Sequence, residues 1–138
     1  MNMILKPDFA AFVLRMALGI VLLAHSLYLK LVVFTLPGTA AFFASIGLPG
    51  MFAYIVFSVE VIAGIGLILG FKTRLFSALV VPVLMGATWV HWANGWLFSN
   101  AGGGWEYPLL LVMIAVVQMG LGDGKYSLAT FITSRQTT

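Results

Sequence analysis

The chain has 138 residues, of which 62% are hydrophobic and 8% are charged, whereas charged residues make up about 25% of ordinary soluble domains. This composition predicts a single membrane domain over 1–138, leaves no room for a soluble catalytic domain and, with no cysteine, excludes disulfides, thiolate catalysis and cysteine-ligated metal centres. The net charge is +3, but the basic residues are scattered singly and form no basic stripe, so no nucleic-acid partner is expected.

Four apolar stretches are long enough, or nearly so, for the roughly 20 residues that one bilayer crossing takes. The first does not read as a cleaved signal peptide, because it contains Arg15 and no small-residue cleavage site follows it. We therefore expect an all-α integral membrane four-helix bundle. Its predicted spans are about 9–29, 51–70, 75–93 and 105–121.

A short helix is predicted at about 39–46, in the connection between the first two spans. Thr39 can cap its start, and Gly47 followed by Pro49 can end it. Its apolar side chains indicate an interfacial or re-entrant helix near the membrane surface. A merely hydrophobic loop is the alternative.

Positive charge favours one side of the predicted bundle. The cations of both termini and of the 71–74 turn lie on that side, whereas the predicted connections on the other side contain one cation, Lys30. The positive-inside rule therefore predicts that both termini are cytoplasmic. Four tryptophans agree, since they fall at the opposite ends of the last two spans, at the headgroup level that tryptophan prefers: Trp89, Trp92, Trp96 and Trp105.

Two charged side chains, Arg15 and Glu60, stand inside predicted spans. Charges at a helix centre cost roughly 2.5–3.5 kcal/mol and usually face partners inside the bundle. With a rise of about 1.5 Å per residue, Arg15 lies about 9 Å and Glu60 about 15 Å from the same end. We expect the two to pair or to share a polar cavity, with Gly19 and Gly64 letting their helices approach closely. The pair would be a proton relay or substrate site, or an ion pair that fixes helix register.

A second polar group is expected at the outer side, where His25, His91 and Glu106 share one depth. A carboxylate beside two imidazoles could hold or pass protons near neutral pH. Neighbouring side chains could line the same opening: Tyr28, Lys30, Trp105 and Tyr107.

The residues of this outer group do not by themselves identify a ligand, and several kinds have to be considered. Two histidines at one depth could ligate haem, but a single such pair disfavours it. A metal site is disfavoured because no short-spaced ligand motif supports it. A quinone or another amphipathic molecule needs only a few polar groups at an apolar boundary, so this residue set is compatible with a quinone, and the sequence does not identify the cofactor. Alternatively, these side chains only anchor the chain at the membrane interface.

Landmarks of a known family occur in order along nearly the whole chain. Besides Arg15 and His25 with Lys30, they are "IGLP" (46–49), "VEVIAGIGLILGFKTR" (59–74), "GGWEYPLLL" (103–111) and "GLGDGKYSL" (120–128). Through them the chain resembles the DoxX family of small four-helix bacterial membrane proteins. The family pattern more often reads His-Gly-x-x-Lys after the first span, whereas here Ser26 replaces the glycine and one more residue precedes Lys30.

The resemblance implies a protein of the bacterial cytoplasmic membrane that is associated with an oxidoreductase, since relatives are linked to thiosulfate:quinone oxidoreductase and to oxidative-stress defence. The leading hypothesis is a subunit that binds an amphipathic redox partner at the outer group. No cysteine or dinucleotide-binding motif is present, so partner subunits would supply electrons.

The rivals are a transporter or lipid-handling protein that uses Arg15 and Glu60, and a scaffold without a ligand. Glycine-rich faces also suit a homo-oligomer.

Overall fold

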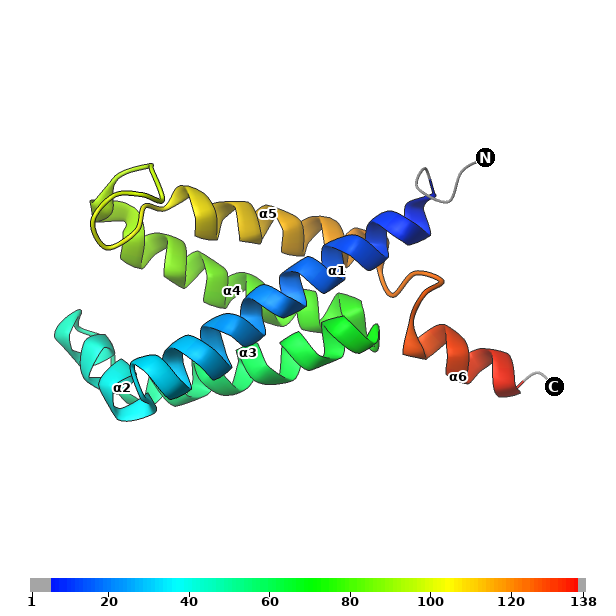
Figure 1. The fold of residues 1–138 in the computed structure, drawn as a ribbon, viewed down its shortest axis with the longest axis horizontal. Coiled ribbons are helices and arrows are strands. Elements are labelled where there is room, and N and C mark those ends of the chain that lie inside the picture. Colours follow the sequence, from blue (N-terminus) through cyan, green and yellow to red (C-terminus); the bar gives the residue numbers. More distant parts are fainter. Residues whose placement is uncertain (1–5, 137–138) are drawn as a thin grey trace.

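The computed structural model describes residues 6–136, and all regular structure in this part of the chain is helical (Figure 1). The all-α prediction is therefore confirmed. The elements in chain order are α1 (Pro7–Leu23), the π-helix η2 (Ala24–Val33), α2 (Leu36–Ser45), α3 (Met51–Leu69), α4 (Thr73–His91), the 3-10 helix η3 (Trp92–Asn94), α5 (Glu106–Leu121) and α6 (Leu128–Gln136).

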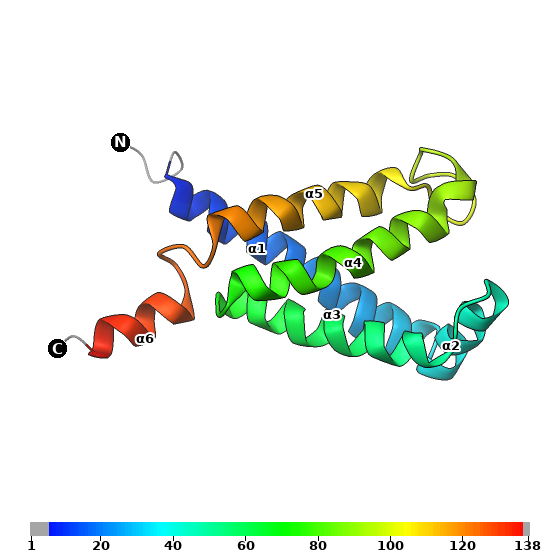
Figure 2. The same cartoon turned by 180° about the vertical axis from the view of Figure 1, so that it is seen from behind.

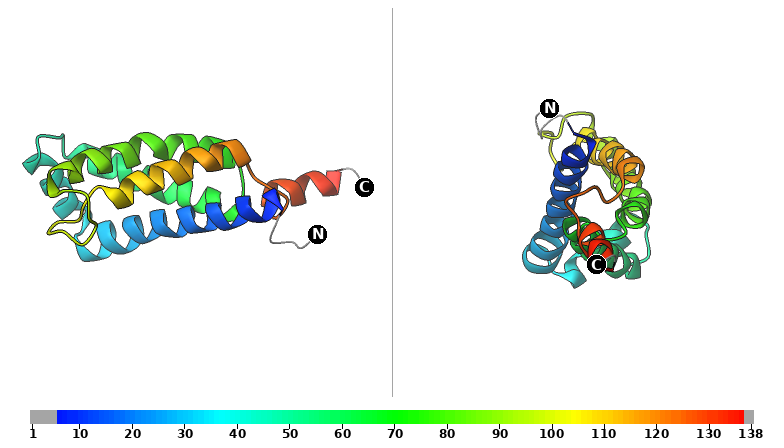
Figure 3. Two further views of the ribbon diagram at one scale, coloured as in Figure 1. Left: turned by 90° about the horizontal axis from the view of Figure 1, so that it is seen from above. Right: turned by 90° about the vertical axis from the view of Figure 1, so that its right-hand side faces the viewer.

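The bundle has two distinct ends, which can be followed from both sides in Figures 1 and 2. The terminal end holds the start of α1, the α3–α4 turn and α6. The loop end holds η2, α2 and the segment 92–105. Seen across its long axis, the molecule is elongated and α6 projects beyond the terminal end (Figure 3). The start of α1 and the end of the described chain thus lie at one end, as an even number of passes requires.

Within the described residues, three helices are long and apolar enough to cross a membrane: Pro7–Val33, which joins α1 and η2, Met51–Leu69 and Thr73–Asn94. The fourth, α5, is apolar but has 16 residues. At about 1.5 Å per residue it is about 24 Å long, which is somewhat less than the hydrocarbon core of about 30 Å. It runs beside α4 through the bundle (Figure 1), so the expected four-helix arrangement is present with one short member.

Two glycines, Gly19 and Gly64, lie where α1 crosses α3 at close range. A Cβ atom on Gly19 would lie 2.9 Å from the carbonyl oxygen of Gly64, and one on Gly64 would lie 2.8 Å from Leu23 Cγ. Small residues permit such close backbone contact between membrane helices. The predicted role of Gly19 and Gly64 is confirmed.

An apolar layer fills the middle of the bundle and receives side chains from α1, α3, α4 and α5. These buried side chains form one cluster, and along their helices they lie between the loop end and the terminal end. The layer consists of Leu18, Leu22, Ala63, Leu67, Val80, Leu84, Leu111 and Ala115.

Three local features differ from the sequence prediction. The short helix begins at Leu36 rather than near residue 39, because the hydroxyl of Thr35 accepts the N–H of Gly38 and caps the helix, while Pro37 occupies its first turn. Its end at the positive-φ Gly47 is as predicted. The first span is longer than 9–29 and ends in a π-helix, and α6 follows the last span where no element was predicted.

Candidate functional site

A buried ion pair joins the first span to α3 in the loop-end half. Lys30 Nζ lies 3.0 Å from Oε1 and 2.7 Å from Oε2 of Glu60. The two side chains are only 16% and 7% exposed. Charged side chains inside a membrane span usually pair with one another and mark a site of function. This pair is therefore the centre of the candidate site.

The π-helix η2 explains how Lys30 reaches this position. In an α-helix of 3.6 residues per turn, positions 25 and 30 would point about 140° apart. A π-helix joins residues five apart, as the hydrogen bond from Phe34 N–H to the carbonyl of Leu29 does, and so turns both side chains to one side. The extra residue before Lys30 is thereby absorbed. Such π segments are rare and occur often at functional sites.

His25 is the third member of the site. Its Nδ1 lies 2.9 Å from the carbonyl oxygen of Val21, and because a carbonyl only accepts, Nδ1 carries the proton. Nε2 is left to interact with another group, and no partner for it occurs within residues 6–136. The ring lies near enough to Glu60 for an electrostatic interaction. It also stacks on Tyr107 of α5, with ring centroids 6.3 Å apart, so the site touches three helices.

The predicted pairing of Arg15 with Glu60 is wrong. Arg15 Nη1 donates to the carbonyl oxygens of Leu67 (3.0 Å) and Ile68 (2.6 Å), and Nη2 donates to that of Tyr126. Arg15 thus lies at the depth of the last turn of α3, where carbonyls lack helical partners. Glu60 is seven residues nearer the loop end than Leu67, about 10 Å along the helix. Arg15 caps α3, and Lys30 takes its expected place beside Glu60.

Glu106 also has a different partner from the one expected. Its Oε1 accepts the N–H of Phe98 at 2.8 Å, which ties the start of α5 to the segment 92–105. The N–H of Glu106 itself donates to the carbonyl of Trp96. The carboxylate therefore serves to fold this segment, and it gains further from the positive end of α5.

The remaining candidates are spread around the loop end. His91 directs Nδ1 to the carbonyl of Ala87 at 2.8 Å, as His25 does to Val21. Trp105 packs between two other tryptophans, stacked on Trp92 at 4.6 Å and edge-on to Trp96 at 4.5 Å. Tyr28 is 63% exposed, so it faces out of the bundle.

The predicted trio of His25, His91 and Glu106 does not assemble. Across residues 6–136, no three His, Cys, Asp or Glu side chains gather as a possible metal site. Depth along a span placed these residues at one level, but the rotation of each helix sends them to different neighbours. Of the eight candidates, Lys30, Glu60 and His25 form a site, and the ligand-binding role of each remains a prediction.

The hydrogen bond of Glu106 predicts the result of a simple replacement. Glu106→Ala should cost about 1 kcal/mol in unfolding free energy and should speed amide hydrogen exchange at Phe98, because that N–H loses its acceptor. Glu106→Gln, which keeps an oxygen acceptor, is the matched control and should retain most of the protection. Equal exchange at Phe98 in wild type and Glu106→Ala would contradict the assignment. Near-ultraviolet circular dichroism of the Trp92–Trp105 pair would report the same change.

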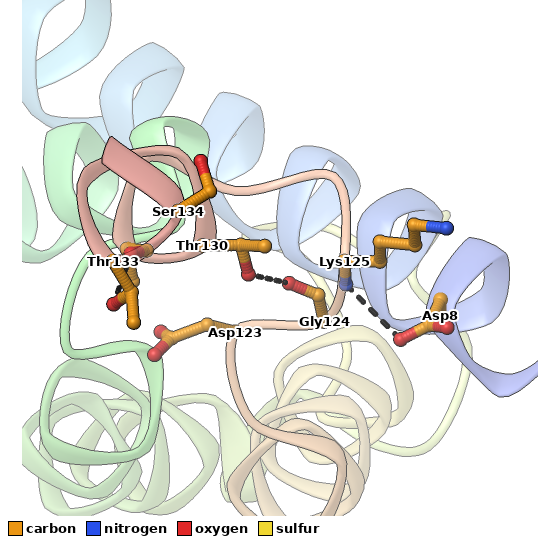
Figure 4. A pocket seen from close by; sticks show the side chains of 8 residues that line it. Asp8, Asp123, Gly124, Lys125, Thr130, Thr133 and Ser134 are labelled. Carbon is orange, nitrogen blue, oxygen red and sulfur yellow. Dashed lines mark hydrogen bonds between the residues drawn. The ribbon is translucent and has the colours of Figure 1, made fainter. Parts of the chain in front are cut away.

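A shallow pocket lies at the opposite, terminal end and is not part of this site (Figure 4). The start of α1, the turn 123–125 and α6 line it. Asp8 accepts the backbone N–H of Lys125 at 3.0 Å, and Thr130 donates to the carbonyl of Gly124 at 3.1 Å. These bonds attach α6 and the preceding turn to the bundle. Thr133 and Ser134 also line the pocket, and they donate to carbonyls within α6 itself.

Sequence reasoning missed several buried polar residues that carry no charge. Ser26 is fully buried beside the site and donates to the carbonyl of Leu22 at 2.8 Å. Thr73, Ser77 and Gln118 are fully buried at the terminal end. Ser26, Ser77 and Gln118 each interrupt an apolar stretch, so their signal was available, whereas Thr73 stands between Lys72 and Arg74 in the predicted basic turn.

The fold and the intramembrane ion pair define a helical membrane protein with a polar site inside its spans. The DoxX family model matches residues 10–92, which is more than half of the chain, so the chain belongs to the DoxX family. It is also similar to the protein named "Putative oxidoreductase CatD" of Bacillus subtilis (strain 168). The two are 31% identical over 113 residues, which cover 82% of this chain and 81% of that protein. No solved structure matches the chain significantly.

Proposed function

We propose that the chain is a cytoplasmic-membrane subunit of an oxidoreductase system, and that His25, Lys30 and Glu60 bind the polar head of a small amphipathic molecule such as a quinone. The buried Lys30–Glu60 pair beside an open imidazole nitrogen is the observation on which the proposal rests. The name of the Bacillus subtilis relative supports the link to redox chemistry.

The hydrogen-bonding groups of the site suit such a head group. Lys30 has three N–H donors, and its ammonium lies against both oxygens of Glu60, so a further N–H can turn to a ligand oxygen. His25 Nε2 can accept an O–H when the ring is neutral, or donate when it is charged. A molecule with a carbonyl or hydroxyl group would meet both a donor and an acceptor, while its apolar part would remain in the membrane.

The competing proposal, a relay from Arg15 to Glu60 in a transporter, has less support. The two side chains bond to different groups, and the apolar layer described above lies between the loop end and the terminal end. A relay would need that layer to open. The proposed subunit needs no such motion, because its ligand would enter from the lipid.

Ligand-dependent stabilisation tests the proposal. A soluble short-chain quinone at 100 times its Kd should stabilise the purified wild-type chain by about 2.7 kcal/mol, measured as an upward thermal shift in detergent. The double variant Lys30→Gln/Glu60→Gln removes both charges together and should lose this shift. Ser58→Ala, two residues from Glu60 and exposed on α3, is the matched control and should keep it.

Two outcomes would overturn the proposal. One is a wild-type chain that no quinone stabilises and whose lipid extract contains no quinone by mass spectrometry. The other is a shift that is equal in wild type and the double variant, because binding would then lie elsewhere in the chain.

A further inference from the structure

Four buried polar atoms at the terminal end have no hydrogen-bond partner among the protein groups of residues 6–136. They are Nε of Arg15, the hydroxyl oxygens of Thr73 and Ser77, and Oε1 of Gln118. None of these residues is more than 1% exposed. Buried polar groups in native proteins are nearly always hydrogen-bonded. Four such atoms in one part of one small bundle therefore require a common explanation.

Three of the four residues are hydrogen-bonded to the same stretch of chain, 122–127. Ser77 lies one helical turn beyond Thr73 on the same buried face of α4, so it looks into the same interior. The other three are tied to the stretch by hydrogen bonds: Gln118 Nε2 to the carbonyl of Gly122 at 2.8 Å, Thr73 N–H to Asp123 at 2.7 Å, and Arg15 Nη2 to the carbonyl of Tyr126.

Depth along the helices agrees with this grouping. Thr73 and Ser77 occupy the first turns of α4, and Gln118 lies three residues before the end of α5, which packs antiparallel to α4. At about 1.5 Å per residue, Ser77 is about 6 Å and Gln118 about 5 Å from the terminal end of its helix. Arg15 reaches the same level from α1, because it bonds to the last turn of α3.

The chemistry of the four atoms restricts what can satisfy them. Arg15 Nε–H can only donate, Gln118 Oε1 can only accept, and the two hydroxyls do both. A metal cation would face the positively charged guanidinium. An anion offers no hydrogen to Gln118 Oε1. The partner must be neutral, small, and able to donate and accept.

We propose that Arg15, Thr73, Ser77 and Gln118 bind buried water, in a site distinct from the loop-end site and separated from it by the apolar layer. Buried waters typically make about three hydrogen bonds each, so on the order of two molecules would satisfy these atoms. The water also completes the solvation of Arg15. The guanidinium contacts carbonyl oxygens, while its negative neighbour, Asp123, interacts with it electrostatically without a direct hydrogen bond.

Single cysteines can report this hydration, because the chain contains no cysteine of its own. In Ser77→Cys, the S–H infrared stretch should convert to S–D at least ten times faster after transfer to D2O than in Ala115→Cys. Ala115 is the matched control: it is 0% exposed, as Ser77 is, but lies in the apolar layer one turn from Gln118. Similar slow exchange at both positions would show a dry site and overturn the proposal.

Thermal stability gives an independent readout. Ser77→Ala is compared with Ser26→Ala, since both serines are fully buried but only Ser26 has protein partners for its hydroxyl. With water bound, Ser77→Ala should lower Tm or leave it unchanged, because a satisfied hydroxyl is lost. A higher Tm for Ser77→Ala than for wild type would mean that the hydroxyl is buried without a partner, and would also overturn the proposal.

Discussion

Replacing Lys30 with methionine should lower the free energy of unfolding by about 3–5 kcal/mol, the usual cost of breaking a buried ion pair by removing one partner. Methionine keeps much of the side-chain volume but leaves Glu60 buried without a counter-charge. Glu60 is 7% exposed and both its oxygens lie on Lys30, and residues 6–136 supply no other hydrogen-bond donor to the carboxylate. The loss can be measured by denaturation in detergent, with Lys125→Met, an exposed lysine at the terminal end, as the control.

The double variant Lys30→Met/Glu60→Gln separates the pair from general damage. Because it removes both charges, it should recover a large part of the loss, and the double-mutant cycle completed by Glu60→Gln should give a coupling energy at least as large as the recovered part. Additive losses, with no coupling, would contradict the ion pair. Recovery would also make this variant a stable background for ligand-binding measurements.

Gly19→Val should lower the free energy of unfolding by about 3 kcal/mol, the upper end of the usual cost of overpacking. Its Cβ would lie 2.9 Å from the carbonyl oxygen of Gly64 and 2.8 Å from Ile68 Cγ1. A backbone oxygen cannot move aside without parting α1 from α3. The ion pair joins the same two segments, so it should weaken as well.

Gly86→Val is the matched control for this experiment. Gly86 is also a helical glycine, but a Cβ added there meets nothing within 4 Å. Thermal unfolding of both variants in the same detergent should show a large loss for Gly19→Val and a small change for Gly86→Val. Equal effects would mean that the loss reflects the helix propensity of valine rather than the crossing of α1 and α3.

The sequence was sufficient to predict the four spans of the bundle and the close approach at Gly19 and Gly64, and to select Lys30, Glu60 and His25 as candidates. These features follow from hydropathy, from small residues and from the cost of charge inside a membrane. The partner of each charge could not be predicted. Depth along a span follows from residue counting, whereas the relative shift and rotation of two helices depend on how all their side chains pack.

Arg15 illustrates this limit. Counting from the predicted ends left it within reach of Glu60, but the packing of α1 on α3 sets it against the carbonyls of Leu67 and Ile68. The π-helix could not be predicted either, because neither composition nor hydrophobic periodicity indicates a change from α-helical to π-helical hydrogen bonding. Uncharged polar residues such as Ser77 were missed for a different reason. A hydroxyl or an amide within an apolar stretch costs less to bury than a charge does, so it is a weaker signal in the sequence.

The winding of η2 also bears on how related chains should be compared. An inserted residue in a membrane helix normally rotates everything beyond it, so alignments rarely permit a gap there. In this chain the wider turn between His25 and Lys30 accommodates one more residue while Lys30 still meets Glu60. A relative with three positions between the same two residue types, wound as an ordinary α-helix, could therefore present an equivalent pair. Two lysines are equivalent at this site if their side chains point toward the same glutamate. An alignment that counts positions alone would pair Lys30 with the wrong residue of such a relative.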